Sequence, residues 1–229
     1  TAGAFPVRLL IAAAVIGLAA RLLFAFGYWT DQPLTRDEQE YLSLARSLAD
    51  RRGFVYDETL TESGAEPFGR APGYPAFLSV VGGGQAPTSS VPATVKAAQA
   101  LVGSLGVLVV GVLAFRLAGR HAAVLAALGA AVYPPLVWIA GYAFSEALFW
   151  PMGLLAAWFF DKSLGQSGSL RWAVLCGLTL GAGILVRPAL VLFVPLAAVW
   201  LARHWRWQVI AAMTLALLAV VGPWTVRNY

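Results

Sequence analysis

The sequence has few charged residues and almost no cysteine. Asp, Glu, Lys and Arg make up only 12% of its 229 residues, whereas 59% are hydrophobic, a balance typical of a polytopic membrane protein. The one cysteine, Cys176, lies in an apolar run, so it can form no internal disulfide and has no neighbouring metal ligands. The sequence also lacks a basic stripe interleaved with aromatics, a Walker loop, a dinucleotide fingerprint and a nucleophile elbow. We therefore expect no nucleic-acid partner and none of the common soluble-enzyme chemistries.

Apolar runs of membrane length fill most of the chain. A helix needs about 20 apolar residues to cross a hydrocarbon core of about 30 Å. We predict an all-α polytopic membrane protein, with residues 1–229 as a single module of about seven spans, near 5–28, 93–118, 121–138, 142–160, 170–186, 188–202 and 207–221. Proline disfavours helix in the residue before it, so Arg187-Pro188 separates the fifth and sixth spans. Because the chain begins with Thr rather than Met and its last segment stops as a span leaves the membrane, we expect both ends to be trimmed relative to the gene product.

The acidic residues are concentrated in the long loop 29–92 that follows the first span. Nine of the eleven carboxylates lie between Asp31 and Glu66. The short connections carry most of their arginines on one side, so the positive-inside rule places the amino terminus in the cytoplasm and this loop outside. A lipid-embedded protein that gathers its acids in one extramembrane loop is expected to hold its polar chemistry there.

The first part of this loop is predicted to form a helix near 35–52. Thr35 and Glu38 have the spacing of a capping box, and an apolar stripe follows at helical spacing. Gly53 is expected to end the helix. We expect this amphipathic juxtamembrane helix to lie on the membrane surface with its stripe down. The second part, rich in Gly and Pro, is expected to be mobile.

Asp37 is the first candidate for catalysis and Glu38 the second. Asp37 lies four residues before Tyr41, so we place both on the membrane-facing side of the helix. A carboxylate at a partly dehydrated interface has a raised pKa and could accept a proton from a hydroxyl group. The alternative is structural, because acids in a first turn favour the helix dipole and Glu38 fits the capping box.

Four further ionisable residues are candidates for binding an anionic lipid head group or supporting the site. Arg70, in a proline-braced turn, could grip a phosphate bidentately or simply snorkel to lipid head groups. Glu146, near the outer start of the fourth span, could orient an arginine, bind a metal or favour the helix dipole. Arg187 and Arg227 lie at outer span ends, where they could surround an anionic head group or anchor the helices.

In their order along the chain, these segments resemble the integral-membrane glycosyltransferases of the GT-C superfamily. Within it they are similar to the bacterial protein-mannosyltransferase and aminoarabinose-transferase-like group (glycosyltransferase family 39-like). The resemblance rests on Arg36-Asp37-Glu38-x-x-Tyr41, Arg70-Ala71-Pro72-Gly73-Tyr74-Pro75, Ser145-Glu146, Arg187-Pro188 and Pro223-Trp224-x-x-Arg227-Asn228.

The resemblance implies an inverting transfer of sugar from a polyprenyl-phosphate donor to an acceptor on the outer face of a bacterial inner (plasma) membrane. It implies Asp37 as general base with Glu38 beside it, and arginines on the donor phosphate at Arg70, Arg187 and Arg227. Tyr41, Tyr74 and Glu146 would support the site. No cofactor is certain and no metal ligands are assigned, a divalent metal stays open, and the acceptor (lipid, glycan or protein) is unnamed.

Two other functions stay open. The chain could be a non-catalytic membrane subunit that keeps the fold and binds a lipid or partner proteins in a larger complex. A transporter ranks last, because the sequence has no pair of broken helices in matching halves and few intramembrane charges.

Overall fold

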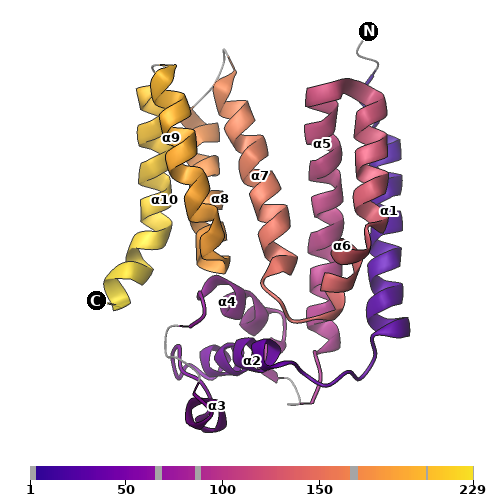
Figure 1. The fold of residues 1–229 in the computed structure, drawn as a ribbon, viewed down its shortest axis with the longest axis vertical. Coiled ribbons are helices and arrows are strands. Elements are labelled where there is room, and N and C mark those ends of the chain that lie inside the picture. Colours follow the sequence, from indigo (N-terminus) through magenta and orange to yellow (C-terminus); the bar gives the residue numbers. More distant parts are fainter. Residues whose placement is uncertain (1–3, 65–68, 86–88, 166–169, 205, 229) are drawn as a thin grey trace. The chain divides into compact units, whose positions relative to one another are not determined.

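The computed structural model describes residues 4–64, 69–85, 89–165, 170–204 and 206–228, and the regular structure within these ranges is entirely helical (Figure 1). The all-α prediction is confirmed. Two compact units are present, Thr1–Pro151 and Met152–Tyr229, and each is described by itself. The helices of the first unit are α1 (Val7–Leu23), the π-helical turn η1 (Phe24–Tyr28), α2 (Arg36–Ala49), α3 (Glu58–Glu62), α4 (Gly73–Val80), η2 (Gly83–Gln85), α5 (Ala93–Val132), α6 (Pro134–Trp138) and η3 (Ile139–Gly141). Helix α7 (Glu146–Leu164) leads into the second unit, which holds α8 (Leu170–Val186), η4 (Pro188–Leu192), α9 (Phe193–Arg203) and α10 (Trp207–Asn228).

Helix α5 contains two of the predicted spans. Its backbone leaves the helical region at Gly119, where φ is 79° and ψ is −166°, a conformation that glycine adopts readily. This break lies where the sequence predicted a boundary between residues 118 and 121. Three helices of the described ranges are long and apolar enough to cross a membrane: Val7–Tyr28, Ala93–Val132 and Trp207–Asn228. The count of about seven spans stays a prediction.

Small residues let α1 pack closely on α5. A methyl group built on Gly111 would collide with Leu10, and one built on Gly103 would lie 2.7 Å from Nε of Arg21. Gly106 likewise makes room for the Trp150 ring. These contacts bring the helix backbones close enough for extensive van der Waals packing, which is the main attraction between helices in lipid.

Arg21 ties α1 to the second half of α5. Its guanidinium is fully buried and donates to the carbonyl oxygens of Gly17, Ala130 and Ala131, at 2.9, 3.4 and 3.3 Å. The last two carbonyls belong to the final turn of α5, where a helix has unpaired acceptors and the negative end of its dipole. The cation therefore serves as a C-terminal cap supplied by a neighbouring helix.

Helix α2 begins as predicted and ends earlier. The Thr35 hydroxyl accepts from the Glu38 N–H and the Glu38 carboxylate accepts from the Thr35 N–H, so the capping box is complete. The helix ends at Ala49, and Arg51 takes the left-handed conformation with φ 58°. Its N–H donates to the Leu48 carbonyl and the N–H of Arg52 donates to the Ser47 carbonyl, the two bonds of a Schellman motif. The prediction that Gly53 ends the helix was wrong, because a non-glycine residue occupies the left-handed position two residues earlier.

The apolar face of α2 packs on protein rather than on lipid. Helix α4 and the turn η2 lie against it, and Leu44 and Ala45 of α2 are fully buried. The expectation of a mobile second part of the loop was wrong for α4, because Tyr74 and Leu78 bury completely against α2 and its surroundings. Residues 86–88 of that part lie outside the described residues.

The second unit has an apolar core between α8, α9 and α10. Cys176 and Leu180 are fully buried there beside Met213. A methyl group built on Gly181 would lie 2.9 Å from Cβ of Val220, so α8 and α10 approach closely. Arg187 has extended backbone, with φ −152° and ψ 121°, which confirms the helix break before Pro188.

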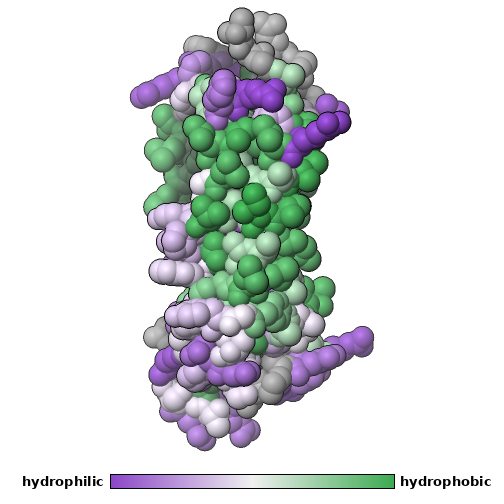
Figure 2. Space-filling view, turned by 90° about the vertical axis from the view of Figure 1, so that its right-hand side faces the viewer, coloured by the Kyte–Doolittle hydropathy of each residue, from purple (hydrophilic) through white to green (hydrophobic). Residues whose placement is uncertain are grey.

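Large apolar side chains also point outward from the helices. Val15 is 59% exposed and Leu23 72% exposed on α1. Figure 2 shows the side of the molecule that carries α1, with a hydrophobic surface between hydrophilic residues at its two ends. An apolar belt of this kind is the surface that a lipid bilayer covers.

Candidate active site

Asp37 and Arg70 are 33 residues apart in the sequence and form an ion pair in the fold. Nη2 of Arg70 donates to Oδ1 of Asp37, and Nε of Arg70 donates to Oε2 of Glu40 at 2.7 Å. The guanidinium carbon also lies 4.9 Å from the centre of the Tyr41 ring. Burial by itself would lower the pKa of Arg70, but the hydrogen bonds from Asp37 and Glu40 outweigh it and raise that pKa. Arg70 is therefore a permanently charged side chain that two carboxylates from the first turns of α2 hold in place.

The surroundings of Asp37 differ from those expected. Its side chain is 53% exposed, whereas Tyr41, one turn later, is only 7% exposed. The prediction that Asp37 and Tyr41 share one partly dehydrated face of α2 was therefore wrong. The Tyr41 ring packs against Tyr74 of α4, whereas the Asp37 carboxylate stays at the surface beside Arg70. An exposed carboxylate can be reached by an acceptor molecule, which a buried one cannot.

Glu38 is buried and its carboxylate is fully occupied. One oxygen accepts from both the N–H and the hydroxyl of Thr35, each at 2.8 Å, and the other accepts from the N–H of Ala143 at 2.9 Å. This residue therefore caps α2 and fixes the loop 29–92 to the segment before α7. A catalytic role for Glu38 stays a prediction.

The three predicted supporting residues lie in one cluster of hydrogen bonds and ring contacts. The Tyr41 hydroxyl donates to Oγ of Ser145 at 3.2 Å, and Ser145 donates to the Glu146 carboxylate at 3.4 Å. Tyr74 meets the Tyr41 ring edge-on at 4.9 Å and donates to Gln99 at 2.6 Å. Complete burial raises the pKa of Tyr74 well above its ordinary value. These hydrogen bonds and the ring contact join α2 and α4 to the start of α5 and of α7.

Sequence reasoning missed Glu40 and Tyr56. Glu40 is 8% exposed and bridges Nε of Arg70 to Nε of Arg36, the latter at 3.2 Å. The sequence did hold a signal for Glu40, which lies directly beside the apolar stripe of α2. A carboxylate buried at such a position needs a cationic partner, so a paired arginine could have been expected. The Tyr56 hydroxyl is buried and has no hydrogen-bond partner within the described ranges. Burial and the charge of Glu40 raise the pKa of Tyr56 to about 12.

Arg187 and Arg227 lie in the second unit. Arg187 stands between α8 and η4, and its N–H donates to the Gly183 carbonyl at 2.8 Å. Arg227 is in the last turn of α10, where its guanidinium lies 5.0 Å from the Trp224 ring centre. Their convergence with Arg70 stays a prediction.

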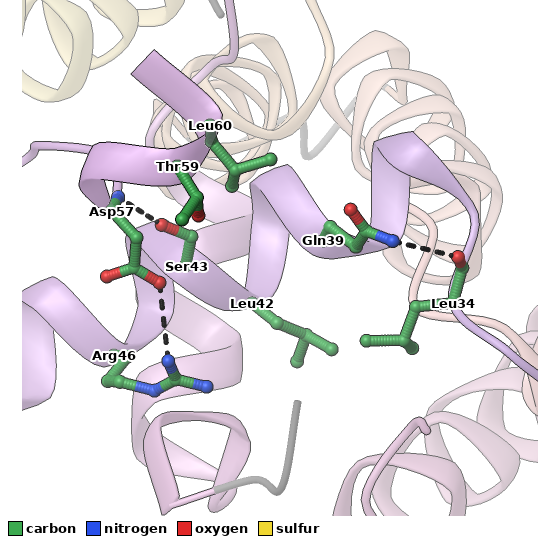
Figure 3. A pocket seen from close by; sticks show the side chains of 8 residues that line it. All are labelled: Leu34, Gln39, Leu42, Ser43, Arg46, Asp57, Thr59 and Leu60. Carbon is green, nitrogen blue, oxygen red and sulfur yellow. Dashed lines mark hydrogen bonds and ion pairs between the residues drawn. The ribbon is translucent and has the colours of Figure 1, made fainter. Parts of the chain in front are cut away.

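Among the described residues, three cavities lie around the loop 29–92 and the helix ends next to it, and neither Asp37 nor Arg70 lines any of these three. Figure 3 shows a cavity of about 240 Å³ on the face of α2 that carries Gln39 and Ser43. Asp57 closes its side, with its N–H donating to the Ser43 hydroxyl at 2.7 Å. A second cavity, of about 400 Å³, is walled by aromatic rings from η1, α6 and the segment before α7. The third, of about 460 Å³, lies between η1 and the start of α5.

Comparison with protein families gives a match over residues 89–226 to the dolichyl-phosphate-mannose-protein mannosyltransferases. The chain belongs to this family. The match covers α5 to α10, more than half the chain, and confirms the resemblance to the GT-C superfamily. This mannosyltransferase-family chain is an integral membrane protein. A comparison with functionally curated proteins finds no match.

Among solved structures, the fold is similar to that of ArnT from Cupriavidus metallidurans, crystallised with undecaprenyl phosphate. The TM-score is 0.66 at 20% sequence identity, and the likeness covers 97% of this chain and 41% of the ArnT chain. It therefore includes the loop that carries α2 and α4, which the family match does not reach. The mannosyltransferase-family chain thus spans less than half the length of this structural neighbour.

Proposed function

We propose that this chain carries the outer-face site of a membrane glycosyltransferase that takes a sugar from a polyprenyl-phosphate donor. One observation carries the proposal. An exposed carboxylate, Asp37, is held by a charged guanidinium, Arg70, in the loop between two membrane-length helices. A lipid-linked phosphate lies at the ends of such helices, so it can reach the pair from the bilayer. The family match and the similarity to a structure that holds a polyprenyl phosphate support the donor class.

The two nitrogens of Arg70 have different tasks in this proposal. Nε is held by the buried Glu40, whereas Nη2 is held by the exposed Asp37. A donor phosphate that binds at Nη2 takes the place of the carboxylate, and Glu40 keeps the side chain in position. Asp37 is then free to accept a proton.

The chemical step is an inverting displacement. Asp37 takes the proton of the acceptor hydroxyl as the acceptor oxygen bonds to the anomeric carbon, and the bond from that carbon to the phosphate oxygen breaks. The charge that develops on the departing lipid phosphate is offset by Arg70, with Arg187 and Arg227 as further candidates. Electrostatic stabilisation of this kind is commonly the largest contribution to catalysis. In this proposal the amino terminus is cytoplasmic and the site lies outside the cell membrane, which is the orientation that the distribution of arginines predicts.

The test is sugar transfer by the intact protein in lipid vesicles, with polyprenyl-phosphate sugars as donors. Asp37→Asn keeps the shape of the side chain and removes the base, so we expect kcat to fall about 100- to 10,000-fold. Asp50→Asn is the matched control, since Asp50 is an exposed aspartate at the other end of α2 and should leave kcat unchanged. Full activity of Asp37→Asn with a normal melting temperature would rule out Asp37 as the base.

A second candidate function is a non-catalytic membrane subunit, and one observation favours it. The charges of Asp37, Glu40, Arg36 and Arg70 are all paired with one another, as in a loop built only for stability. If the chain is such a subunit, we expect Asp37→Asn to lower the melting temperature and to leave any sugar-transfer rate unchanged. The experiment above separates the two functions.

A further inference from the structure

The cavity between η1 and the start of α5 is separate from the Asp37–Arg70 site. Its volume is about 460 Å³, and it opens at the ends of two membrane-length helices, where lipid head groups lie. Its wall includes Lys96 of α5, Asp31 of the loop after η1, the hydroxyl residues Thr30, Ser90 and Thr94, and the apolar Phe26. It shares no lining residue with the ion-paired cluster around Arg70.

Lys96 is a buried cation that is hydrogen-bonded to backbone carbonyls, and the charges of Asp31 and Glu38 act on it from beyond ion-pair distance. Its side chain is almost fully enclosed, with the residue 6% exposed. The ammonium donates to the carbonyl oxygens of Ala25 at 3.2 Å and Trp29 at 2.6 Å. An ammonium has three donors, and no described carboxylate lies within 4.0 Å of it. Among the described residues, the ammonium has neutral carbonyls at hydrogen-bond distance and no carboxylate, so its third donor can take an anion that enters the cavity.

Asp31 gives the same cavity an opposite charge. Its backbone is left-handed, with φ 48°, a conformation that Asp adopts more readily than most other non-glycine residues. Within the described part of the chain its carboxylate makes no ion pair at 4.0 Å or less. The cavity wall therefore holds one cation and one anion that are not in contact with each other. A ligand with a negative and a positive group could pair with both.

We propose that this cavity binds the phosphoethanolamine head group of a membrane phospholipid. The phosphate would accept from the Lys96 ammonium, and the ethanolammonium group would pair with Asp31. Helix α5 begins at this wall after Pro92 and has no side-chain cap, so its first N–H groups add positive potential for the phosphate. The acyl chains would follow the exposed apolar surface of Phe26, which is 44% exposed. The proposal does not depend on sugar transfer, because neither Lys96 nor Asp31 belongs to the ion-paired cluster around Arg70.

The test compares lipids with identical acyl chains on protein that has been purified and stripped of lipid. Phosphatidylethanolamine, phosphatidylglycerol and diacylglycerol are offered separately, and retained lipid is counted by native mass spectrometry. We expect phosphatidylethanolamine to bind best and diacylglycerol least. Lys96→Met should weaken phosphatidylethanolamine binding by about tenfold, the effect of one charged hydrogen bond. Lys162→Met makes the same change in α7 and should have no effect.

Asp31→Asn keeps the test decisive if Lys96→Met fails to fold, because Asp31 is exposed. This variant should bind phosphatidylethanolamine no better than phosphatidylglycerol. Competition then separates a lipid head group from a free anion. Water-soluble glycerophosphoethanolamine should displace the lipid, and inorganic phosphate should do so much more weakly. Equal binding of diacylglycerol, an unchanged preference in Asp31→Asn, or equal competition by inorganic phosphate would each overturn the proposal.

Discussion

Replacing Glu38 by alanine tests how the loop 29–92 is held in place. The carboxylate accepts from Thr35 through both its N–H and its hydroxyl, and from the N–H of Ala143, which is fully buried. Loss of a helix cap costs about 1 kcal/mol. A buried N–H left without an acceptor costs about 1–3 kcal/mol more. We therefore expect Glu38→Ala to lower the free energy of unfolding by about 2–4 kcal/mol.

For a protein of this size, each kcal/mol corresponds to about 2–4 °C in melting temperature, so the variant should melt roughly 5–15 °C lower. Thermal unfolding of the purified protein in detergent, followed by circular dichroism, measures the shift. Glu62→Ala is the matched control, because Glu62 is an exposed glutamate at the end of α3. If Glu38→Ala melts like the wild-type protein while sugar transfer is lost, the structural role is refuted and the catalytic prediction for Glu38 gains support.

Three more outcomes are expected. Arg70→Lys should lower kcat/KM by about 10- to 100-fold in the transfer assay, since one ammonium cannot hold Glu40 and Asp37 as the forked guanidinium does; unchanged kinetics would contradict this. Arg51→Gly should raise the free energy of unfolding by about 0.5–1 kcal/mol, because glycine accepts φ 58° without Cβ strain, and a lower melting temperature would show the reasoning to be wrong. Tyr56 keeps its proton longer in the folded protein, with a pKa raised to about 12 from 10, so its contribution to stability is complete below pH 10 and is lost as the pH rises through 12. Tyr56→Phe should therefore lose less stability than the wild-type protein over that interval in thermal melts, and equal losses would argue against it.

Local patterns predicted local structure well. Thr35 and Glu38 gave the start of α2, because both bonds of a capping box join residues three apart. A span boundary between residues 118 and 121 and a break before Pro188 were also predicted, and the structure has a helix break at Gly119 and extended backbone at Arg187. The end of α2 could not be predicted in this way, because Arg51 takes a left-handed conformation that its own chemistry disfavours.

The candidate site was predicted as a set of residues and not as a set of contacts. Asp37 and Arg70 were both named from their local patterns, and the fold brings them together across 33 residues. Glu40 was missed because its role depends on its ion pair with Arg70, and residues 30 positions apart show no local spacing pattern. The exposure of Asp37 was also mispredicted, since α4 packs over Tyr41 and leaves the neighbouring carboxylate at the edge.

Composition and hydrophobic run length by themselves determined that this chain is a helical membrane protein with its acids in one loop between spans, because both follow from the free energy of placing each residue in lipid or water. Only the tertiary structure decided which carboxylate is buried and which is open. Glu38 and Asp37 are adjacent in sequence and almost identical in chemistry, but one caps a helix against Ala143 and the other faces solvent beside Arg70. Hydrogen-bond partners supplied by distant segments make that distinction, and such partners exist only once the chain has packed.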